Sequence, residues 1–169
     1  LKAAEMYNET YLNENLTVLV DYFGKEISDS LQVCKRFSKK AQEGKLAIRI
    51  DTHGGRFIEG LDTEKSYNVL EKNAPESIRT YRTEQELKWM VGTGVSAAAI
   101  WYIRLALDKK GWNKVKIIAS SGFNPAKCKL FASINVPVDI IGTGSYLPDT
   151  WTETYATADI IKYGNNKLV

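Results

Sequence analysis

Four apolar segments of this sequence each end in residues that can bind a ligand or take part in catalysis. The first two segments end at acidic residues, and the other two end in serine, threonine and glycine. These residues are Asp21, Asp51, Ser120, Ser121, Gly122, Gly142, Thr143 and Gly144. Glycine lets backbone N–H groups approach an anion closely, and hydroxyl groups donate further hydrogen bonds. The last two segment ends therefore predict a phosphate site, with two ordinary tight turns as the alternative.

Arg49 and Asp51 flank Ile50 in the second apolar segment, so we expect both to point to the same side of a strand. Charged side chains on an otherwise buried strand are costly unless they are paired or used. A structural ion pair and a pair of site residues both remain open. Arg56 follows two glycines and is a candidate to reach an anionic ligand, with a solvent-facing role as the alternative. The single histidine, His53, is expected to be a loop residue, and it excludes a multi-histidine metal site.

Two G-x-G motifs bear on dinucleotide binding. The motif at 142–144 does not fit, because Leu147 stands where the fingerprint needs a third glycine or an alanine. The motif at 92–97 matches G-x-G-x-x-A and opens a helical pattern. The residues before it, 86–91, are amphipathic rather than a β-branched strand, and the acidic residue expected about 20 positions later is missing. We therefore do not predict a dinucleotide site at either motif.

The apolar segments and the patterns between them predict a parallel α/β fold. The apolar segments lie at 16–20, 46–50, 115–119 and 138–141, and they are short and rich in Val, Ile and Leu. Such runs are typical of strands buried on both faces. The helical patterns lie at 26–40, 95–109 and 125–133. Alternating strands and helices indicate right-handed crossovers, which bring the carboxyl ends of the strands to one edge, where ligands bind.

Two other segments complete this organisation. The polar segment 52–94 interrupts the alternation, and its length predicts a functional loop region with short helices at 67–72 and 83–91. Residues 158–161 indicate a strand that enters a turn. The chain lacks an initiating methionine and starts within a helical pattern, so we expect it to be part of a longer protein.

The composition is that of one globular domain of 169 residues, with 44% hydrophobic and 25% charged residues. The net charge of +3 argues against an obligate nucleic-acid binder. Cys34 and Cys128 lack metal-ligand spacing, so we expect free thiols in a reducing compartment. The sequence has no apolar run of about 18 residues and no signal-peptide pattern at its start, so neither a membrane span nor secretion is expected.

Four stretches of the sequence together resemble the carboxyl-terminal part of nicotinate phosphoribosyltransferases. They are LTVLVDYFGKEISDSLQVC, LAIRIDTHGGRF, VKIIASSGFN and VDIIGTGSYLP. Their order and spacing resemble those of the family over essentially the whole chain. The resemblance implies that residues 1–169 form the carboxyl-terminal portion of an irregular TIM-like α/β barrel, in which 52–94 is a long active-site loop region.

The resemblance also implies an activity and roles for individual residues. The family makes nicotinate mononucleotide and pyrophosphate from nicotinate and phosphoribosyl pyrophosphate in NAD biosynthesis, with Mg²⁺ and usually with coupled ATP hydrolysis. Carried over by motif, Asp51 would hold the ribose hydroxyls, and Arg49 would lie near the pyridine ring. Thr52 and Arg56 would belong to a substrate loop. The residues that would cradle the 5′-phosphate are Ser120, Ser121, Gly122, Gly142, Thr143 and Gly144.

Other implications concern the whole enzyme. The family enzyme is a cytoplasmic homo-oligomer that uses small-molecule substrates, with neither nucleic acid nor membrane as a partner. Its phosphoryl-accepting histidine and its first barrel strands lie upstream of the part that this chain resembles. We therefore expect little or no turnover from this chain alone, and association of copies through exposed strand edges. The alternatives are a non-catalytic phosphate-binding α/β module and a relative specific for nicotinamide or quinolinate.

Overall fold

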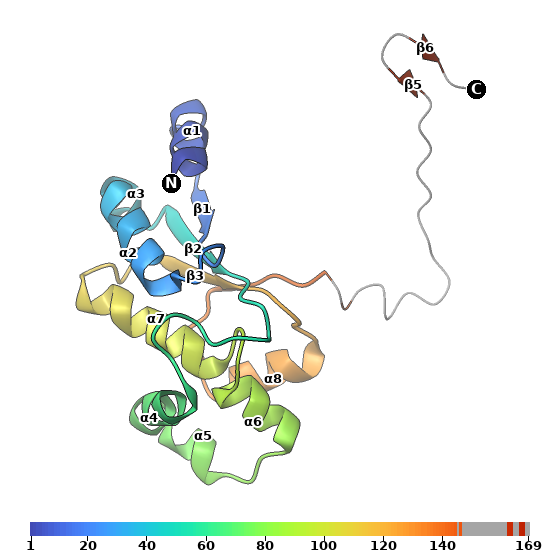
Figure 1. Ribbon diagram of the computed structural model, residues 1–169. Coiled ribbons are helices and arrows are strands. Elements are labelled where there is room, and N and C mark those ends of the chain that lie inside the picture. The colour runs from blue at the N-terminus through green and yellow to red at the C-terminus, as the bar shows by residue number, and fades with distance from the viewer. Residues whose placement is uncertain (145, 147–161, 164–165, 168–169) are drawn as a thin grey trace.

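The fold is built on a four-stranded parallel sheet in a computed structural model that describes residues 1–144, 146, 162–163 and 166–167 (Figure 1). The strands are β1 (Leu16–Leu19), β2 (Leu46–Ile50), β3 (Lys116–Ala119) and β4 (Ile140–Ile141). They lie in the order β1-β2-β3-β4, and every neighbouring pair is parallel. The chain therefore adds strands in one direction across the sheet, which confirms the predicted α/β class. A closed barrel is not seen in this part of the chain.

Eight helices connect or flank these strands in the described part of the chain. They are α1 (Lys2–Thr10), α2 (Glu26–Arg36), α3 (Ser38–Gln42), α4 (Thr63–Asn73), α5 (Pro75–Arg79), α6 (Glu84–Val91), α7 (Ala97–Lys109) and α8 (Pro125–Ser133). The last two match the predicted helices closely. The helix predicted over 26–40 is instead two helices, because the buried Phe37 has φ −111° and ψ 41° and breaks the helical backbone. Asn124 begins α8 by accepting a hydrogen bond from the Lys127 amide, and Pro125 follows it.

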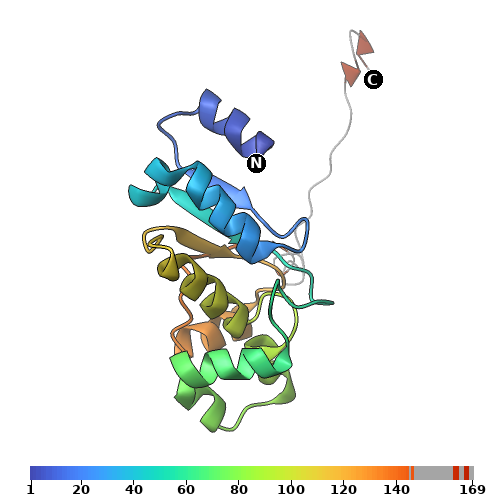
Figure 2. The same cartoon turned by 60° about the vertical axis from the view of Figure 1, so that its left-hand side comes forward.

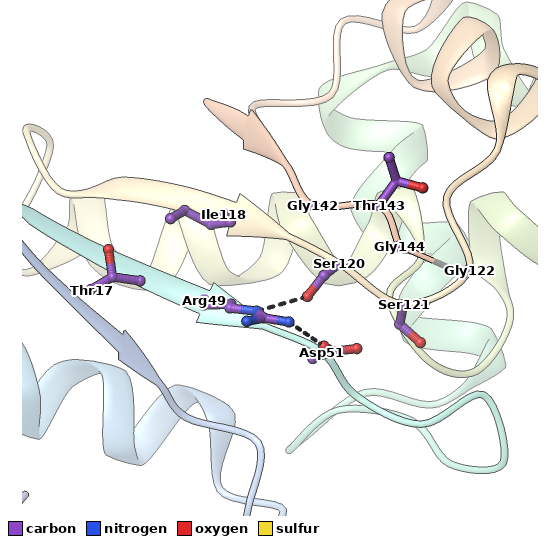
Figure 3. A pocket seen from close by; sticks show the side chains of 10 residues that line it. All are labelled: Thr17, Arg49, Asp51, Ile118, Ser120, Ser121, Gly122, Gly142, Thr143 and Gly144. Atoms are coloured by element: carbon purple, nitrogen blue, oxygen red, sulfur yellow. Dashed lines mark hydrogen bonds and ion pairs between the residues drawn. The ribbon is translucent and has the colours of Figure 1, made fainter. Parts of the chain in front are cut away.

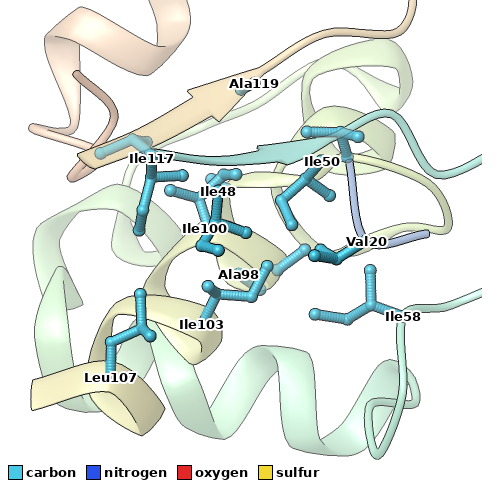
Figure 4. Close-up of a cluster of buried hydrophobic side chains, with 14 of the residues drawn as sticks. Val20, Ile48, Ile50, Ile58, Ala98, Ile100, Ile103, Leu107, Ile117 and Ala119 are labelled. Carbon is cyan, nitrogen blue, oxygen red and sulfur yellow. The ribbon is translucent and has the colours of Figure 1, made fainter. Parts of the chain in front are cut away.

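The sheet and α7 share one apolar core (Figure 4). Ile48 and Ile50 of β2 and Ile117 of β3 pack with Ile100 and Ile103 of α7, and all five side chains are fully buried. Burial of each such side chain contributes about 1.5–3 kcal/mol. This core fixes the carboxyl ends of β2 and β3, so the residues that follow them have defined positions.

The two faces of the sheet differ in exposure, which corrects the prediction of strands buried on both faces. Helices α2 and α7 pack against one face of the sheet (Figure 2). Leu16 and Leu46 are buried. On the opposite face, Thr17 and Arg49 are exposed and Leu19 is 51% exposed. In the described part of the chain, α2 and α7 cover the first face, and the second face carries the exposed residues. The prediction was wrong because the apolar residues of these runs do not alternate strictly with polar ones, and such continuous runs are typical of strands buried on both faces.

The segment 52–94, predicted to be a loop region, contains three of the helices. The predicted short helices correspond to α4 and α6, and α5 lies between them. α4 and α6 both pack against α7, with Leu70 and Met90 fully buried. Most of the segment therefore forms a helical layer outside α7 rather than a loop over the carboxyl edge of the sheet.

Near the carboxyl terminus, β5 (Lys162–Tyr163) pairs antiparallel with β6 (Asn166–Lys167). The strand predicted over 158–161 lies outside the described residues. Cys34 and Cys128 are both free thiols, and burial raises the pKa of Cys34 to about 12. Among the described residues, no helix has both the length and the apolar character needed to cross a membrane.

Candidate functional site

An open cavity of about 590 Å³ lies at the carboxyl edge of the sheet (Figure 3). It is lined by Thr17, Arg49, Asp51, Ile118, Ser120, Ser121, Gly122, Gly142, Thr143 and Gly144. Eight of these ten residues are the ones that the sequence indicated as catalytic or phosphate-binding. They come from β2 and from the loops after β2, β3 and β4, so the parallel topology brings three distant parts of the chain together.

Arg49 and Asp51 form an ion pair inside this cavity. Arg49 Nη2 lies 2.7 Å from Asp51 Oδ2, and Arg49 Nε donates to the Ser120 hydroxyl at 3.0 Å. The Arg49 side chain is 45% exposed and the Asp51 side chain 32% exposed. A guanidinium carries five N–H donors, so most of the donors of Arg49 remain open to a ligand. The structure therefore confirms the ion pair, and both residues also line the cavity. Their role in binding a ligand stays a prediction.

The loop after β3 presents unused backbone amides to the cavity. Ser121 and Gly122 both have left-handed backbones, with φ 82° and φ 65°. Their N–H groups make no backbone hydrogen bond with any residue in the described part of the chain. Successive amides in such a turn form a concave donor site for an anion. The loop leads into α8, whose amino-terminal dipole also favours negative charge.

The loop after β4 is tied to the loop after β3. The Gly142 amide donates to the Ala119 carbonyl at 2.8 Å, and the Thr143 hydroxyl donates to the Phe123 carbonyl at 2.9 Å. A Cβ atom at Gly142 would lie 3.2 Å from the Ser120 Cβ, so glycine allows the two loops to approach closely. Gly144 has open space beside its Cα. The two loops thus form one preorganised wall.

Thr52 and Arg56, predicted to belong to a substrate loop, do not line this cavity. Both bind the carboxylate of Glu26, which is fully buried at the start of α2. Thr52 Oγ1 donates to Glu26 Oε1 at 2.9 Å, and Arg56 Nη2 lies 2.6 Å from the same oxygen. The Glu59 amide donates to Glu26 Oε2 at 3.0 Å. Burial alone would raise the pKa of Glu26, but hydrogen bonds from Arg56, the Glu59 amide and Thr52 lower it.

This second cluster joins three segments of the chain. Arg56 also donates to the Asp21 carbonyl at 2.9 Å, so Glu26 and Arg56 connect the end of β1 to the segment after β2. Nothing in the sequence around Glu26 distinguishes it from an ordinary acidic residue in a first helical turn, and sequence reasoning missed it. The Asp21 carboxyl is half-buried, and burial together with the nearby charges of Asp51 and Glu26 raises its pKa.

His53 is an exposed loop residue, as predicted. Its Nδ1 accepts a hydrogen bond from the Gly55 amide at 3.0 Å. Within the described residues, no three His, Cys, Asp or Glu side chains gather in a group that could hold a metal. α6 precedes the G-x-G-x-x-A motif at 92–97, where a dinucleotide fingerprint requires a strand, so this motif does not form one.

Comparison with family models, with curated proteins and with solved structures finds no match to this chain.

Proposed function

We propose that the cavity is part of the active site of a phosphoribosyltransferase of the nicotinate type. The enzyme would form nicotinate mononucleotide and pyrophosphate from nicotinate and phosphoribosyl pyrophosphate in NAD biosynthesis. One observation carries the proposal: a single cavity is lined by all eight residues that the resemblance assigns to the sugar, the ring and the 5′-phosphate. Thr52 and Arg56 are not part of the proposed site, because both are bound to Glu26.

The proposed chemistry is a displacement at the anomeric carbon of the ribose. The pyridine nitrogen donates its electron pair to form the new C–N bond, and pyrophosphate leaves with the electrons of the broken C–O bond. Positive charge develops on the ribose, and the Asp51 carboxylate would stabilise that charge while it holds the ribose hydroxyls. Arg49 would orient Asp51 through their 2.7 Å contact and would direct its free N–H groups toward the pyridine substrate.

The 5′-phosphate would bind the wall formed by the loops after β3 and β4. The free amides of Ser121 and Gly122 would donate to the phosphate oxygens, and the contact between Thr143 and the Phe123 carbonyl would hold the second loop in place. Mg²⁺ would enter as part of the substrate, bound to the pyrophosphate group whose charge it neutralises. In the family, ATP hydrolysis supplies further driving force.

We further propose that the sheet belongs to an irregular β/α barrel. Two features support this architecture: the strands follow one another in a single direction, and the face opposite α2 and α7 carries Thr17 and Arg49. In a barrel this face would be the interior, and further strands would lie beyond β1 and β4. A homo-oligomer formed through these free strand edges is an expectation of the same proposal.

The first test is binding by the chain described here. Isothermal titration calorimetry with ribose 5-phosphate and with nicotinate mononucleotide should detect binding of both. Asp51→Asn should weaken both affinities by about tenfold, because a charge-assisted contact is lost. Asp29→Asn on α2 serves as the matched control and should bind as the parent does. Absence of binding to both ligands, or equal affinities in the parent and Asp51→Asn, would overturn the proposal.

The second test is turnover by the full-length gene product that includes this sequence. Nicotinate, nicotinamide and quinolinate are each offered with the magnesium complex of phosphoribosyl pyrophosphate, and the product is identified by mass spectrometry. Nicotinate should be the preferred substrate, and Asp51→Asn should reduce kcat by about 100-fold or more. Preference for another pyridine would support the related enzyme instead.

A non-catalytic phosphate-binding module is the second candidate. It is favoured by one observation: the anion-binding loops are preformed, whereas Asp51 is already paired with Arg49. Such a module would bind ribose 5-phosphate, but even the full-length gene product would form no mononucleotide from any of the three pyridines.

A further inference from the structure

A second, smaller cavity borders the loop that carries Ser121 and Gly122. Its volume is about 190 Å³. It is lined by Gly54, Gln85, Lys88, Trp89, Thr93, Gly94, Val95, Ser121, Gly122 and Lys127. Helices α6 and α8 contact each other (Figure 1). They contribute Lys88 and Lys127 to this cavity. Only Ser121 and Gly122 are shared with the first cavity.

Lys127 is a buried cation in this cavity. The Lys127 residue is only 5% exposed. Nζ donates to the Ser121 carbonyl at 3.2 Å and lies 4.2 Å from the centroid of the Phe123 ring. An ammonium group has three N–H donors, so one carbonyl does not satisfy it. Nζ also lies 5.6 Å from the centroid of the Phe131 ring. Burial lowers the pKa of Lys127 to about 8.

No carboxylate in the described part of the chain forms an ion pair with Lys127. Buried charges in proteins are normally paired, because an unpaired buried charge costs several kcal/mol. The other charged side chain that lines the cavity, Lys88, is also a cation. The cavity therefore contains positive charge and no compensating negative charge from its own lining residues.

The backbone around the cavity also favours a negatively charged ligand. Thr93, Gly94 and Val95 belong to the G-x-G-x-x-A motif that precedes α7, and the Ser96 side chain caps that helix. Gly94 has φ 75°, and a Cβ atom there would lie 3.0 Å from the Gly54 Cα, so this glycine lets the loop approach residue 54. Two helices, α7 and α8, thus begin beside one cavity, and their dipoles favour an anion.

We propose that this second cavity binds a small oxyanion of the phosphate class, for which Lys127 is the buried counter-ion. The proposal goes beyond the phosphoribosyl transfer described above, because that reaction makes no use of Lys127, Lys88 or the 92–97 motif. Two sources share this chemistry: free phosphate and the phosphate group of a larger ligand. The glycine motif, which has no dinucleotide role, would then help to form an anion site.

The test is a titration of the ¹⁵N-labelled chain with inorganic phosphate, followed by amide NMR. Binding in the second cavity should shift the Gly94 amide and the Trp89 indole signals. Lys127→Met should abolish these shifts or weaken the affinity at least about tenfold, because a charged contact is lost. Lys129→Met, an exposed lysine on the same helix, is the matched control and should titrate as the parent does. Unchanged binding in Lys127→Met would overturn the proposal.

The same titration separates this proposal from the proposed function. Phosphate in the first cavity should shift the Gly142 and Gly144 amides, and Thr143→Val should weaken that response alone, because the loop after β4 loses its contact with the Phe123 carbonyl. Shifts at Gly142 without shifts at Gly94 would refute the second site and leave the first. Shifts at Gly94 that persist in Thr143→Val, without shifts at Gly142, would support the second site and count against the first. A ribose 5-phosphate arm then shows whether free phosphate or a phosphoryl group is preferred.

Two further measurements guard against misfolding of the variant. Lys127→Met should raise Tm in the absence of phosphate, because methionine replaces an uncompensated charge beside Phe123. In the parent chain, ¹³C NMR of the Lys127 side chain should show a titration midpoint that moves upward when phosphate is added. Lys88 and Cys128 are the neighbouring titratable groups, and Lys88→Met and Cys128→Ala identify their contributions. If phosphate does not move this titration midpoint, the proposal is contradicted, and no substitution of Lys127 is needed to show it.

Discussion

Two arginine–carboxylate pairs lie near the carboxyl edge of the sheet, and they differ in burial rather than in length. Arg49 and Asp51 are 2.7 Å apart, and Arg56 and Glu26 are 2.6 Å apart. Asp51 is 32% exposed, whereas Glu26 is fully buried. Glu26 also accepts hydrogen bonds from Thr52 and from the Glu59 amide. We refer to these as the open pair (Arg49 and Asp51) and the closed pair (Arg56 and Glu26).

The difference shows that one type of ion pair, arginine with a carboxylate, can either be enclosed by the chain or face a cavity. The closed pair has its oxygens satisfied by the chain, so it connects the end of β1 to the segment after β2 and has little left for a ligand. The open pair faces a cavity and retains guanidinium donors. An exposed ion pair contributes little to stability, whereas breaking a buried pair leaves an uncompensated charge. Stability and ligand binding should therefore respond in opposite ways to changes in the two pairs.

The largest expected effect comes from Arg56→Met. This change leaves the buried Glu26 carboxylate without its cation, and we expect a loss of about 3 kcal/mol in the free energy of unfolding. Arg49→Met is the matched change in the open pair and should alter stability by about 1 kcal/mol or less. Urea denaturation of the two variants measures the contrast. Equal losses would show that burial does not distinguish the pairs.

The closed pair should also govern stability in acid. The pKa of Glu26 is lowered from 4.5 in the folded chain. At a pH between this lowered pKa and 4.5, the unfolded chain therefore binds more protons at Glu26 than the folded chain does. Its contribution is therefore complete above about pH 4.5 and is lost as the pH falls through the folded pKa. The free energy of unfolding should decline more steeply below that pH in the parent than in Glu26→Gln. Asp21, whose pKa is raised, acts with the opposite sign in both proteins.

Thr52→Val should give a smaller loss. The substitution removes one buried hydrogen bond to Glu26 and should cost about 1–2 kcal/mol, with no effect on phosphate affinity in the first cavity. Ser120→Ala is its counterpart beside the open pair. It should change stability less, yet weaken phosphate binding, because the proposed phosphate site loses the Ser120 hydroxyl. Thermal unfolding and phosphate titration of both variants test this reversal.

The smallest expected effect is at Ser121, in the loop beside the open pair. Its φ of 82° is unfavourable for a residue with a side chain, so Ser121→Gly should raise stability by about 0.5 kcal/mol after the greater freedom of unfolded glycine is counted. Gly122→Ala, at φ 65°, should lower stability by about 1 kcal/mol. Differential scanning calorimetry compares them, and a loss of stability in Ser121→Gly would argue against backbone strain at this loop.

Several features of the candidate site could be predicted from the sequence. The strand ends after 50, 119 and 141 were identified from short apolar runs that stop at polar or glycine residues, and the parallel topology then required them to meet. The alternation of Arg49 and Asp51 about Ile50 likewise placed both on one face. The sequence could not predict that Arg49 lines the cavity and Arg56 does not. This difference depends on Glu26, which lies on a helix from another part of the chain and binds Arg56.

The sequence by itself determined the order of strands and helices and the identity of eight of the ten residues that line the first cavity, because apolar periodicity and strand-end chemistry are local properties. Only the tertiary structure decided which arginine is closed by Glu26, which face of the sheet stays exposed, and that Lys127 is buried beside a second cavity. The physical reason is burial: whether a charged side chain is satisfied depends on segments packed against it from elsewhere in the chain, and no local pattern records their approach.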